Sequence, residues 1–390
     1  MSAELTSHLP RRTRVVIAGG GVAALEALLA LRADAGDLVD ITLVADTDTF
    51  FYRSLQVGEA FGIGHPRRYS LALLVADSGG RFIHAPVASV RTDARELVLG
   101  DGGTVTYDAL LLALGARTVP AFDHGTTFGP ASFEEVLEDV RSDFAGDVTI
   151  VVPEGARWSL PAYELALLTA SWSEGRNIDV RIVTHEAAPL DVFGPEAAAA
   201  VASVLERAGV QLVAGVAPDV PQDGLVRAGD HWLPAGRIVS LPVPVGPRVR
   251  GVPSTADGYL DCDQHGRVRS TPGVWAAGDG TAYPIKQGGL AGQQADAVAA
   301  DIARLSGAPT RPRPFRPVLR GLLRTATGPL YLRRSLVTED GGTTVSGEPL
   351  WWPPSKVASR RLASHLGRLD VEAAAAQRLP GGGFPLTAIR

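Results

Sequence analysis

The sequence predicts an α/β protein with two doubly wound parallel sheets, the second inserted in the first, followed by a C-terminal cap segment. Two observations lead to this fold class. A strand–helix–strand pattern occurs twice, over residues 14–45 and 148–213, and an apolar strand with a long helix follows the second copy, over residues 274–305. Strands that alternate with helices are typical of parallel sheets covered by helices on both faces.

The first copy of the pattern contains a glycine turn. A short apolar run, Val15–Ala18, predicts a buried strand, the residues Gly19, Gly20 and Gly21 follow it, and a helix is predicted from Val22 to Arg32. Gly19 permits the sharp turn, and Gly21 has no side chain, so that a pyrophosphate can approach the backbone. Free N–H groups and a partial positive charge at the start of the helix favour phosphate. These residues predict a Rossmann-like dinucleotide site.

Five residues of this turn are predicted to contact the phosphates or to allow close packing of helix and strand: Gly19, Gly21, Val22, Ala23 and Ala24. The second strand of the unit, Ile41–Val44, should end at an acid that binds the adenosine ribose. That place is Ala45, and Asp46 follows one residue later. Either Asp46 binds the ribose or the ribose is held in another way.

The rest of the first sheet and the second sheet are read from short apolar runs. Strands are expected at residues 81–83 and 87–90, a hairpin at 96–107, and a buried strand with a glycine turn at 107–115. The second unit has strands at 148–152, 180–183 and 210–213 and helices at 161–172 and 195–208. Stretches rich in proline and glycine, 116–130 and 241–256, predict the two linkers. The expected organisation is a leader (1–12), a first domain (13–125 and 244–308), an inserted domain (126–243) and a C-terminal segment (309–390).

Length and composition limit the class of protein. A chain of 390 residues suits two or three domains, and a charged fraction of 20% is that of a globular protein. The net charge of −5 argues against a nucleic-acid binder. The single cysteine, Cys262, excludes an intrachain redox disulfide. No apolar run is long enough for a membrane span, and we expect a cytoplasmic protein.

Three motifs resemble those of the FAD-dependent pyridine nucleotide–disulfide oxidoreductase superfamily. They read VIAGGGVAALEAL, YDALLLALGA and VWAAGDGTAYPIKQGGLAGQQADAVAADI, and the resemblance covers residues 14–306. Within the superfamily, the chain is most similar to the sulfide:quinone oxidoreductase and type II NADH dehydrogenase branch. The resemblance implies an enzyme, an oxidoreductase with FAD as its cofactor.

The resemblance also implies roles for individual residues. Ala113 and Gly115 should lie beside the cofactor, and Gly278 and Asp279 should hold its ribityl–phosphate part. The following helix should point its positive N-terminus at the pyrimidine edge of the flavin, with Lys286 and Gln287 beside it. The backbone at Val87 should hold the adenine.

Residues that face the reacting part of the flavin are expected in the segment after the first unit. Lys286, Tyr52 and Arg53 are the catalytic candidates, and Arg53 is also a cofactor-binding candidate. The histidines show no metal-ligand spacing, so no metal site is predicted.

The chain departs from the family in its second glycine turn and in its cysteines. Only Gly155 remains of the glycines, and Trp158, Pro161 and Tyr163 are bulky where a pyrophosphate needs bare backbone. Glu164 matches the family's helical acid, and Glu186 remains a candidate to hold a ribose. No cysteine occurs between residues 51 and 64, where disulfide reductases have their redox pair.

The C-terminal segment is basic and amphipathic. Seven arginines and no acid occur between residues 311 and 334, and Leu362, Leu366 and Leu369 share one helical face. This pattern suits either contact with an anionic membrane surface or a partner subunit, or packing against the first domain. Trp351 and Trp352 either wall a quinone-like pocket or anchor the tail.

The functional prediction is an FAD-dependent oxidoreductase that passes electrons to or from a quinone-like or small organic partner, without a redox disulfide. One alternative is an NAD(P)H dehydrogenase with an altered nucleotide pose. Another is a non-catalytic flavoprotein that senses redox state or acts as a scaffold. A homodimer or a peripheral contact with the inner membrane surface through the C-terminal segment is a further hypothesis.

Overall fold

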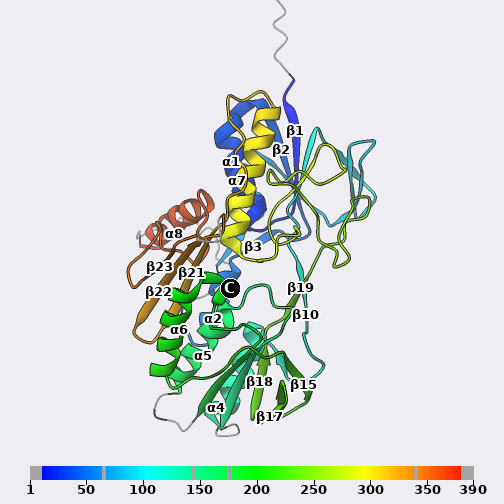
Figure 1. Cartoon of the computed structure of the whole chain (residues 1–390). Coiled ribbons are helices and arrows are strands. Elements are labelled where there is room, and N and C mark those ends of the chain that lie inside the picture. Colours follow the sequence, from blue (N-terminus) through cyan, green and yellow to red (C-terminus); the bar gives the residue numbers. More distant parts are fainter. Residues whose placement is uncertain are drawn as a thin grey trace, which may run out of the picture.

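The chain folds into two α/β parts joined by a pair of strands, with a C-terminal part against both of them (Figure 1). The computed structural model describes residues 11–63, 67–142, 146–173, 175, 178–337 and 341–378. Most of the predicted leader, residues 1–10, lies outside the described residues.

The first sheet is parallel throughout, as predicted. Its strands are ordered β20 (Val274–Ala276), β9 (Ala109–Leu112), β1 (Thr13–Ala18), β2 (Val39–Ala45) and β5 (Arg81–His84). Helices α1 (Val22–Ala35) and α7 (Gly288–Leu305) pack side by side on one face. The antiparallel strands β6 (Val87–Arg91), β7 (Glu96–Leu99) and β8 (Thr104–Thr106) contribute to the core on the other face.

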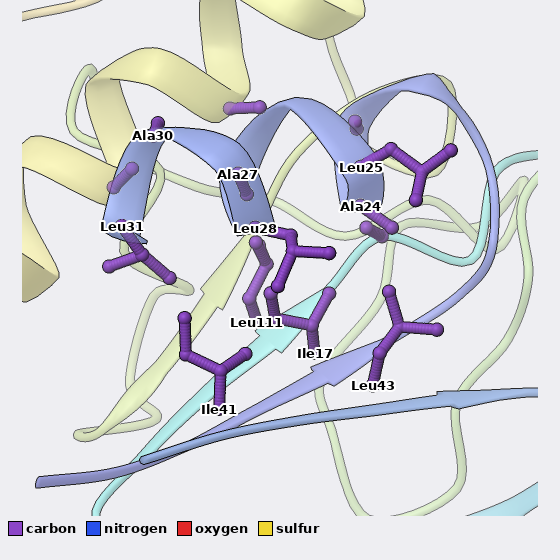
Figure 2. Close-up of a cluster of buried hydrophobic side chains, with 14 of the residues drawn as sticks. Ile17, Ala24, Leu25, Ala27, Leu28, Ala30, Leu31, Ile41, Leu43 and Leu111 are labelled. Atoms are coloured by element: carbon purple, nitrogen blue, oxygen red, sulfur yellow. The ribbon is translucent and has the colours of Figure 1, made fainter. Parts of the chain in front are cut away.

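Successive residues of β1 enter two different cores, because side chains alternate along a strand. Val15 and Ile17 are buried against α1, and Val16 and Ala18 are buried in the core with β6–β8. Figure 2 shows the first of these cores, where Ile17, Leu43 and Leu111 lie beneath the apolar side of α1. Burial on both faces explains why this strand is an uninterrupted apolar run.

The second sheet is also parallel and repeats the design. Its order is β11 (Thr126–Thr127), β18 (Arg237–Ser240), β12 (Asp147–Val152), β13 (Asp179–Thr184) and β14 (Gln211–Val213). The other elements of this part are α4 (Pro130–Arg141), α5 (Leu160–Trp172), α6 (Pro195–Arg207), the 3-10 helix η3 (Asp191–Phe193), β15 (Pro218–Gln222), β16 (Leu225–Ala228) and β17 (His231–Pro234). The chain enters and leaves through the antiparallel pair β10 (Arg117–Val119) and β19 (Val243–Val245), so each predicted linker contains one strand of this pair. The boundaries of the domains stay a prediction.

The C-terminal segment is a sheet followed by a helix. Strands β21 (Val318–Thr325), β22 (Gly328–Ser335) and β23 (Thr343–Ser346) are antiparallel, and α8 (Leu362–Arg378) comes after them. The predicted helical face is confirmed, since Leu362 and Leu366 are buried and Leu369 packs against the same core as α1. The sequence analysis did not predict the β21–β22 hairpin.

Short elements complete the fold: η1 (Gly36–Leu38), β3 (Thr49–Phe51), η2 (Arg53–Leu55), α2 (Gln56–Glu59), β4 (Arg68–Ser70) and α3 (Leu71–Asp77). Within the described residues, no helix combines the length and the apolar character that a membrane span requires.

A buried carboxylate joins the start of α8 to the first sheet's helices. Glu26 of α1 is fully buried, and its oxygens accept hydrogen bonds from the backbone N–H groups of Arg361 (2.7 Å) and Leu362 (2.8 Å). The Arg361 guanidinium forms ion pairs with Asp34 (2.9 Å) and Asp296 (2.5 Å). Burial raises the pKa of Glu26. The N-terminus of α8 is therefore held by charged groups of α1 and α7.

Replacing Glu26 by glutamine tests this contact. The substitution Glu26→Gln keeps the shape but sets an NH₂ group against a backbone N–H, which leaves a buried donor without an acceptor. We expect the free energy of unfolding to fall by about 1–3 kcal/mol, measured by chemical denaturation, and α8 to be cut sooner in limited proteolysis. The matched control is Glu135→Gln on the exposed side of α4. Equal stability of the two variants would contradict the role of Glu26.

Candidate functional site

The glycine turn after β1 combines a tightly packed residue with an open one. Gly19 has φ +127°, and a Cβ atom there would lie 2.1 Å from the carbonyl oxygen of Ala113. Gly21 is the N-cap of α1, is exposed, and a Cβ atom there would meet nothing within 4 Å. The close approach at Gly19 thus shapes the turn, and the open space at Gly21 lies where a phosphate group would bind.

The first turn of α1 presents free backbone donors to this space. The first intrahelical hydrogen bond runs from the Leu25 N–H to the Gly21 carbonyl (3.1 Å), and no side chain caps the helix. The N–H groups of Val22, Ala23 and Ala24 precede that bond and have no partner within the helix. With the positive end of the helix dipole, they form an anion-binding surface.

The third motif packs directly against the first. A Cβ atom on Gly278 would lie 3.0 Å from the Ala23 Cβ atom, and one on Gly280 would lie 3.0 Å from the Gly115 carbonyl oxygen. The structure thus brings the three sequence motifs together at the N-terminal ends of α1 and α7, around Gly21, Gly115 and Gly278.

Gln294 of α7 fixes the turn at Gly278, and the sequence analysis did not identify it. Its Oε1 accepts a hydrogen bond from the Gly278 N–H (2.6 Å), and its Nε2 donates to the Thr281 hydroxyl (3.3 Å). The Thr281 hydroxyl in turn donates to the Gly278 carbonyl (2.9 Å). The signal that the sequence offered for Gln294 was a glutamine within an alanine-rich helix.

Asp279 lies in the same turn and faces two cations. Burial raises its pKa, and the charges of Lys286 and Arg53 oppose that effect. The charge of Arg53 thus acts on Asp279, although the two residues are 226 positions apart in the chain. The prediction that both contact FAD stays a prediction, and their proximity favours it.

Lys286 holds the loop that leads into α7. Its Nζ donates hydrogen bonds to the carbonyls of Thr281 (2.5 Å) and Tyr283 (2.7 Å) and lies 3.9 Å from the centre of the Tyr259 ring. Burial lowers the pKa of Lys286 to about 8. With its donors engaged by backbone carbonyls, Lys286 positions the loop in this structure, and its predicted contact with the flavin stays a prediction.

Gln287 caps α7. Its Oε1 accepts from the Leu290 N–H (2.9 Å), and its Nε2 donates to the Arg320 carbonyl of β21 (3.1 Å). The two remaining candidates, Asp46 and Val87, lie at the ends of β2 and β6, and Asp46 is exposed. No described contact joins these two residues to the glycine turns, so their roles also stay predictions.

The second glycine turn is filled by the protein's own side chains. A Cβ atom on Gly155 would lie 2.8 Å from the Val243 side chain, and the rings of Trp158 and Phe193 pack with centroids 5.9 Å apart. Glu186 is 7% exposed and accepts hydrogen bonds from the hydroxyls of Ser159 (2.7 Å) and Tyr163 (2.7 Å). The carboxylate that was a candidate to hold a second ribose is therefore engaged within the domain.

A cavity of about 450 Å³ lies between the first domain, α5 and the C-terminal hairpin. Its lining is mainly apolar: Tyr52, Leu55, Ile63, Leu168, Leu322, Arg324, Thr325, Gly328, Pro329, Pro354, Ser355 and Lys356. The fully buried Glu164 of α5 forms an ion pair with Lys356, and its second oxygen lies 3.7 Å from the Arg324 guanidinium. The family's helical acid thus binds the C-terminal segment.

The segment 351–361, which we call the strap, connects this cavity to the glycine turns. The Val357 N–H donates to the Tyr52 hydroxyl (3.2 Å), and a Cβ atom on Gly288, the first residue of α7, would lie 3.0 Å from the Val357 side chain. Trp351 packs on Tyr331 with centroids 5.0 Å apart, whereas Trp352 is 86% exposed. Neither tryptophan lines the cavity, so Trp351 anchors the strap instead.

Cys262 is unsuited to thiol chemistry. Burial, followed by the charges of Asp261 and Asp263, raises the pKa of its thiol to about 11. The thiolate is therefore scarce at neutral pH.

The chain is similar in sequence and in fold to known proteins. A family model described as pyridine nucleotide-disulphide oxidoreductase matches residues 13–296. The chain is 26% identical over 294 residues to an NADH dehydrogenase-like protein of Mycobacterium tuberculosis, across 68% of this chain and 72% of the relative. It is 29% identical over 408 residues to the type II NADH:quinone oxidoreductase of the same organism, across 89% and 84% of the two chains. The solved structure of the sulfide:quinone oxidoreductase from Aquifex aeolicus has a similar fold, with a TM-score of 0.74 at 20% identity over 86% of this chain and 87% of that one.

Two glycine variants separate a structural role from a cofactor role. Gly21→Val adds a side chain in open space, so the free energy of unfolding of the FAD-free protein should stay within about 0.5 kcal/mol of wild type. The amount of FAD retained on purification should fall at least about tenfold, which corresponds to a loss of about 1.4 kcal/mol in binding free energy. Gly19→Ala collides with the Ala113 carbonyl and should lower stability by about 1–3 kcal/mol or more. The absorbance of released flavin measures the FAD retained, and thermal unfolding measures the stability. Full FAD retention by Gly21→Val would contradict the phosphate site.

Lys286 gives a pH-dependent contribution to stability. Its pKa of about 8 in the folded protein lies below its ordinary value of 10.5, so between these values the unfolded chain binds more protons. Stability contributed by this residue therefore rises as the pH increases through that window. In FAD-free protein, the free energy of unfolding of wild type minus that of Lys286→Met should increase over this range. The difference cancels the other titrating groups, and a constant difference would contradict the burial of a charged lysine.

Proposed function

Because this chain belongs to the pyridine nucleotide-disulphide oxidoreductase family and is an FAD-dependent oxidoreductase, we propose that it exchanges electrons with a quinone-like or other small organic partner, without a redox disulfide. When bound, FAD supplies a flavin ring that takes up and releases electrons. The chain's own residues bind and orient the cofactor and shape the place where the partner binds.

The groups that meet at the glycine turns fit this cofactor. Bare backbone at Gly21 and three free N–H groups of α1 suit its pyrophosphate, and the turn at Gly278 and Asp279 lies against the same helix end. Gln294 and Lys286 hold that turn and the following loop in place. A site built on hydrogen-bonded turns keeps its geometry when the ligand enters, which lowers the entropic cost of binding.

The electron-transfer partner is proposed to bind in the cavity between Tyr52 and the C-terminal hairpin. Tyr52 precedes Arg53, whose charge acts on Asp279, and Lys356 precedes Val357, which packs at the N-terminus of α7. The cavity therefore borders the proposed flavin site along two segments. Its volume of about 450 Å³ and its apolar lining suit a ring compound, and the cations of Lys356 and Arg324 supply donors for an oxygen atom.

The second domain favours a donor other than NAD(P)H. Ser159 and Tyr163 occupy both oxygens of Glu186, and Val243 and Phe193 fill the turn around Gly155 and Trp158. A mechanism without a redox disulfide is supported by the presence of a single cysteine, Cys262, whose raised pKa keeps its thiol protonated at neutral pH. An NAD(P)H dehydrogenase with an altered nucleotide pose stays the second candidate, because two relatives are named as NADH-oxidising enzymes.

Anaerobic rapid mixing tests the proposal. Photoreduced, FAD-loaded protein should be reoxidised by a short-chain quinone within seconds, whereas NADH and NADPH should leave the oxidised flavin spectrum unchanged. Pro329→Trp, which fills the cavity mouth from β22, should slow reoxidation by the quinone about tenfold or more, a change of about 1.4 kcal/mol.

The control is Ala326→Trp, which places the same side chain in the exposed turn of the hairpin, outside the cavity lining. It should react like wild type. Rapid bleaching of the flavin by NADH or NADPH, together with no reaction with quinone, would refute the proposal and favour the second candidate.

A further inference from the structure

We propose that the cavity beneath the C-terminal hairpin selects a ring compound that carries an ionised acidic group, held by Arg324, over its neutral counterpart. This inference rests on the proposed function and names the class of partner for the same cavity. It follows from the arrangement of charge at the floor of the cavity.

Two of the three charged groups here, Lys356 of the cavity lining and Glu164, which is not part of the lining, neutralise each other. Glu164 is fully buried, the Lys356 side chain is 9% exposed, and their charged ends form an ion pair. Burial lowers the pKa of Lys356, and the neighbouring Glu164 opposes that effect. The carboxylate and the ammonium group together carry no net charge.

Arg324 is the third group, and it adds a second positive charge beside the single carboxylate. Its guanidinium lies 3.7 Å from Glu164 Oε1, within ion-pair distance but beyond hydrogen-bond distance. Its Nη1 atom and Glu164 Oε1 are both buried without a hydrogen-bond partner among the described residues. No other charged side chain belongs to the described lining of the cavity. The floor therefore keeps one net positive charge in mainly apolar surroundings.

An unmatched buried charge is costly, and a ligand anion removes the cost. The guanidinium fork suits an oxyanion, because two N–H groups can bind two oxygens or one oxygen from two directions. The apolar side chains of Leu55, Leu168 and Leu322 suit the faces of a ring. A planar compound with an ionised hydroxyl or carboxyl group satisfies both requirements, whereas a neutral ring leaves Arg324 unmatched.

The test compares two ligands of almost the same shape. The probe 2-hydroxy-1,4-naphthoquinone is ionised at neutral pH, and 2-methoxy-1,4-naphthoquinone is neutral. Binding of each to oxidised, FAD-loaded protein is measured by calorimetry. We expect the anion to bind at least about tenfold more tightly to wild type, as for a hydrogen bond to a charged group.

Variants of Arg324 assign the preference to that residue. Arg324→Gln should weaken binding of the anion by about 10- to 100-fold and leave binding of the methoxy compound unchanged. Arg324→Lys keeps the charge and should retain most of the preference; if the glutamine protein is unstable, the comparison of the two compounds in wild type remains the deciding test. Arg316→Gln, an exposed arginine of the same segment outside the lining, should behave like wild type.

Each remaining outcome overturns the inference in a recognisable way. Equal affinities for the two compounds in wild type, or a preference that survives in Arg324→Gln, would refute it. If both compounds bind equally and both reoxidise the reduced flavin, the proposed function stands without the selectivity. If neither binds and neither reoxidises the flavin, the proposed function fails as well.

Discussion

A pyrophosphate can bind at the start of a helix only where the backbone is bare, and the organisation of this chain depends on where that condition holds. At Gly21 the space is open and the N–H groups of α1 are free. At the corresponding turn of the second sheet, Gly155 is packed against Val243, and Trp158 lies against Phe193. The two halves share a topology, but of these two turns only the first is open at the start of its helix. The second has become a folded support whose polar groups bind one another.

The C-terminal part connects these two halves. Glu26 of α1 receives the start of α8, and Glu164 of α5 receives Lys356. Between these anchors the strap crosses the N-terminal end of α7, where Gly288 and Gly292 leave room for Val357 and Ser359. The strap thus covers the N-terminal end of α7, beside which we propose that FAD binds, and the cavity lies next to it. Glu26 and Glu164 lie on separate helices, and both are buried because the C-terminal segment supplies their partners. Formation of the cavity therefore depends on docking of this segment.

Elements that depend on a short local pattern were predicted from the sequence, whereas contacts between segments that are far apart in the chain were missed. The unit β1–α1–β2 and the bounds of α7 follow from apolar runs and a glycine turn, all within short stretches. The β21–β22 hairpin was missed because its arginines were read as one basic segment, and because Gly321, Leu322 and Leu323 are buried in succession and so give no simple alternation. Nothing local links Ser159 and Tyr163 to Glu186. One signal was present but unused, since Glu26 is an acid inside an apolar helix. Of the chain's two lysines, Lys286 was a candidate and Lys356 was not considered.

The central claim is that one nucleotide site is open and the other is closed. Calorimetric titration with ADP, the part that FAD and NAD(P)H share, counts such sites directly. FAD-free protein should bind one ADP per chain, and protein loaded with FAD should bind none. A second ADP per chain that still binds when FAD is present would contradict the account, because it would require an open phosphate site in the second domain.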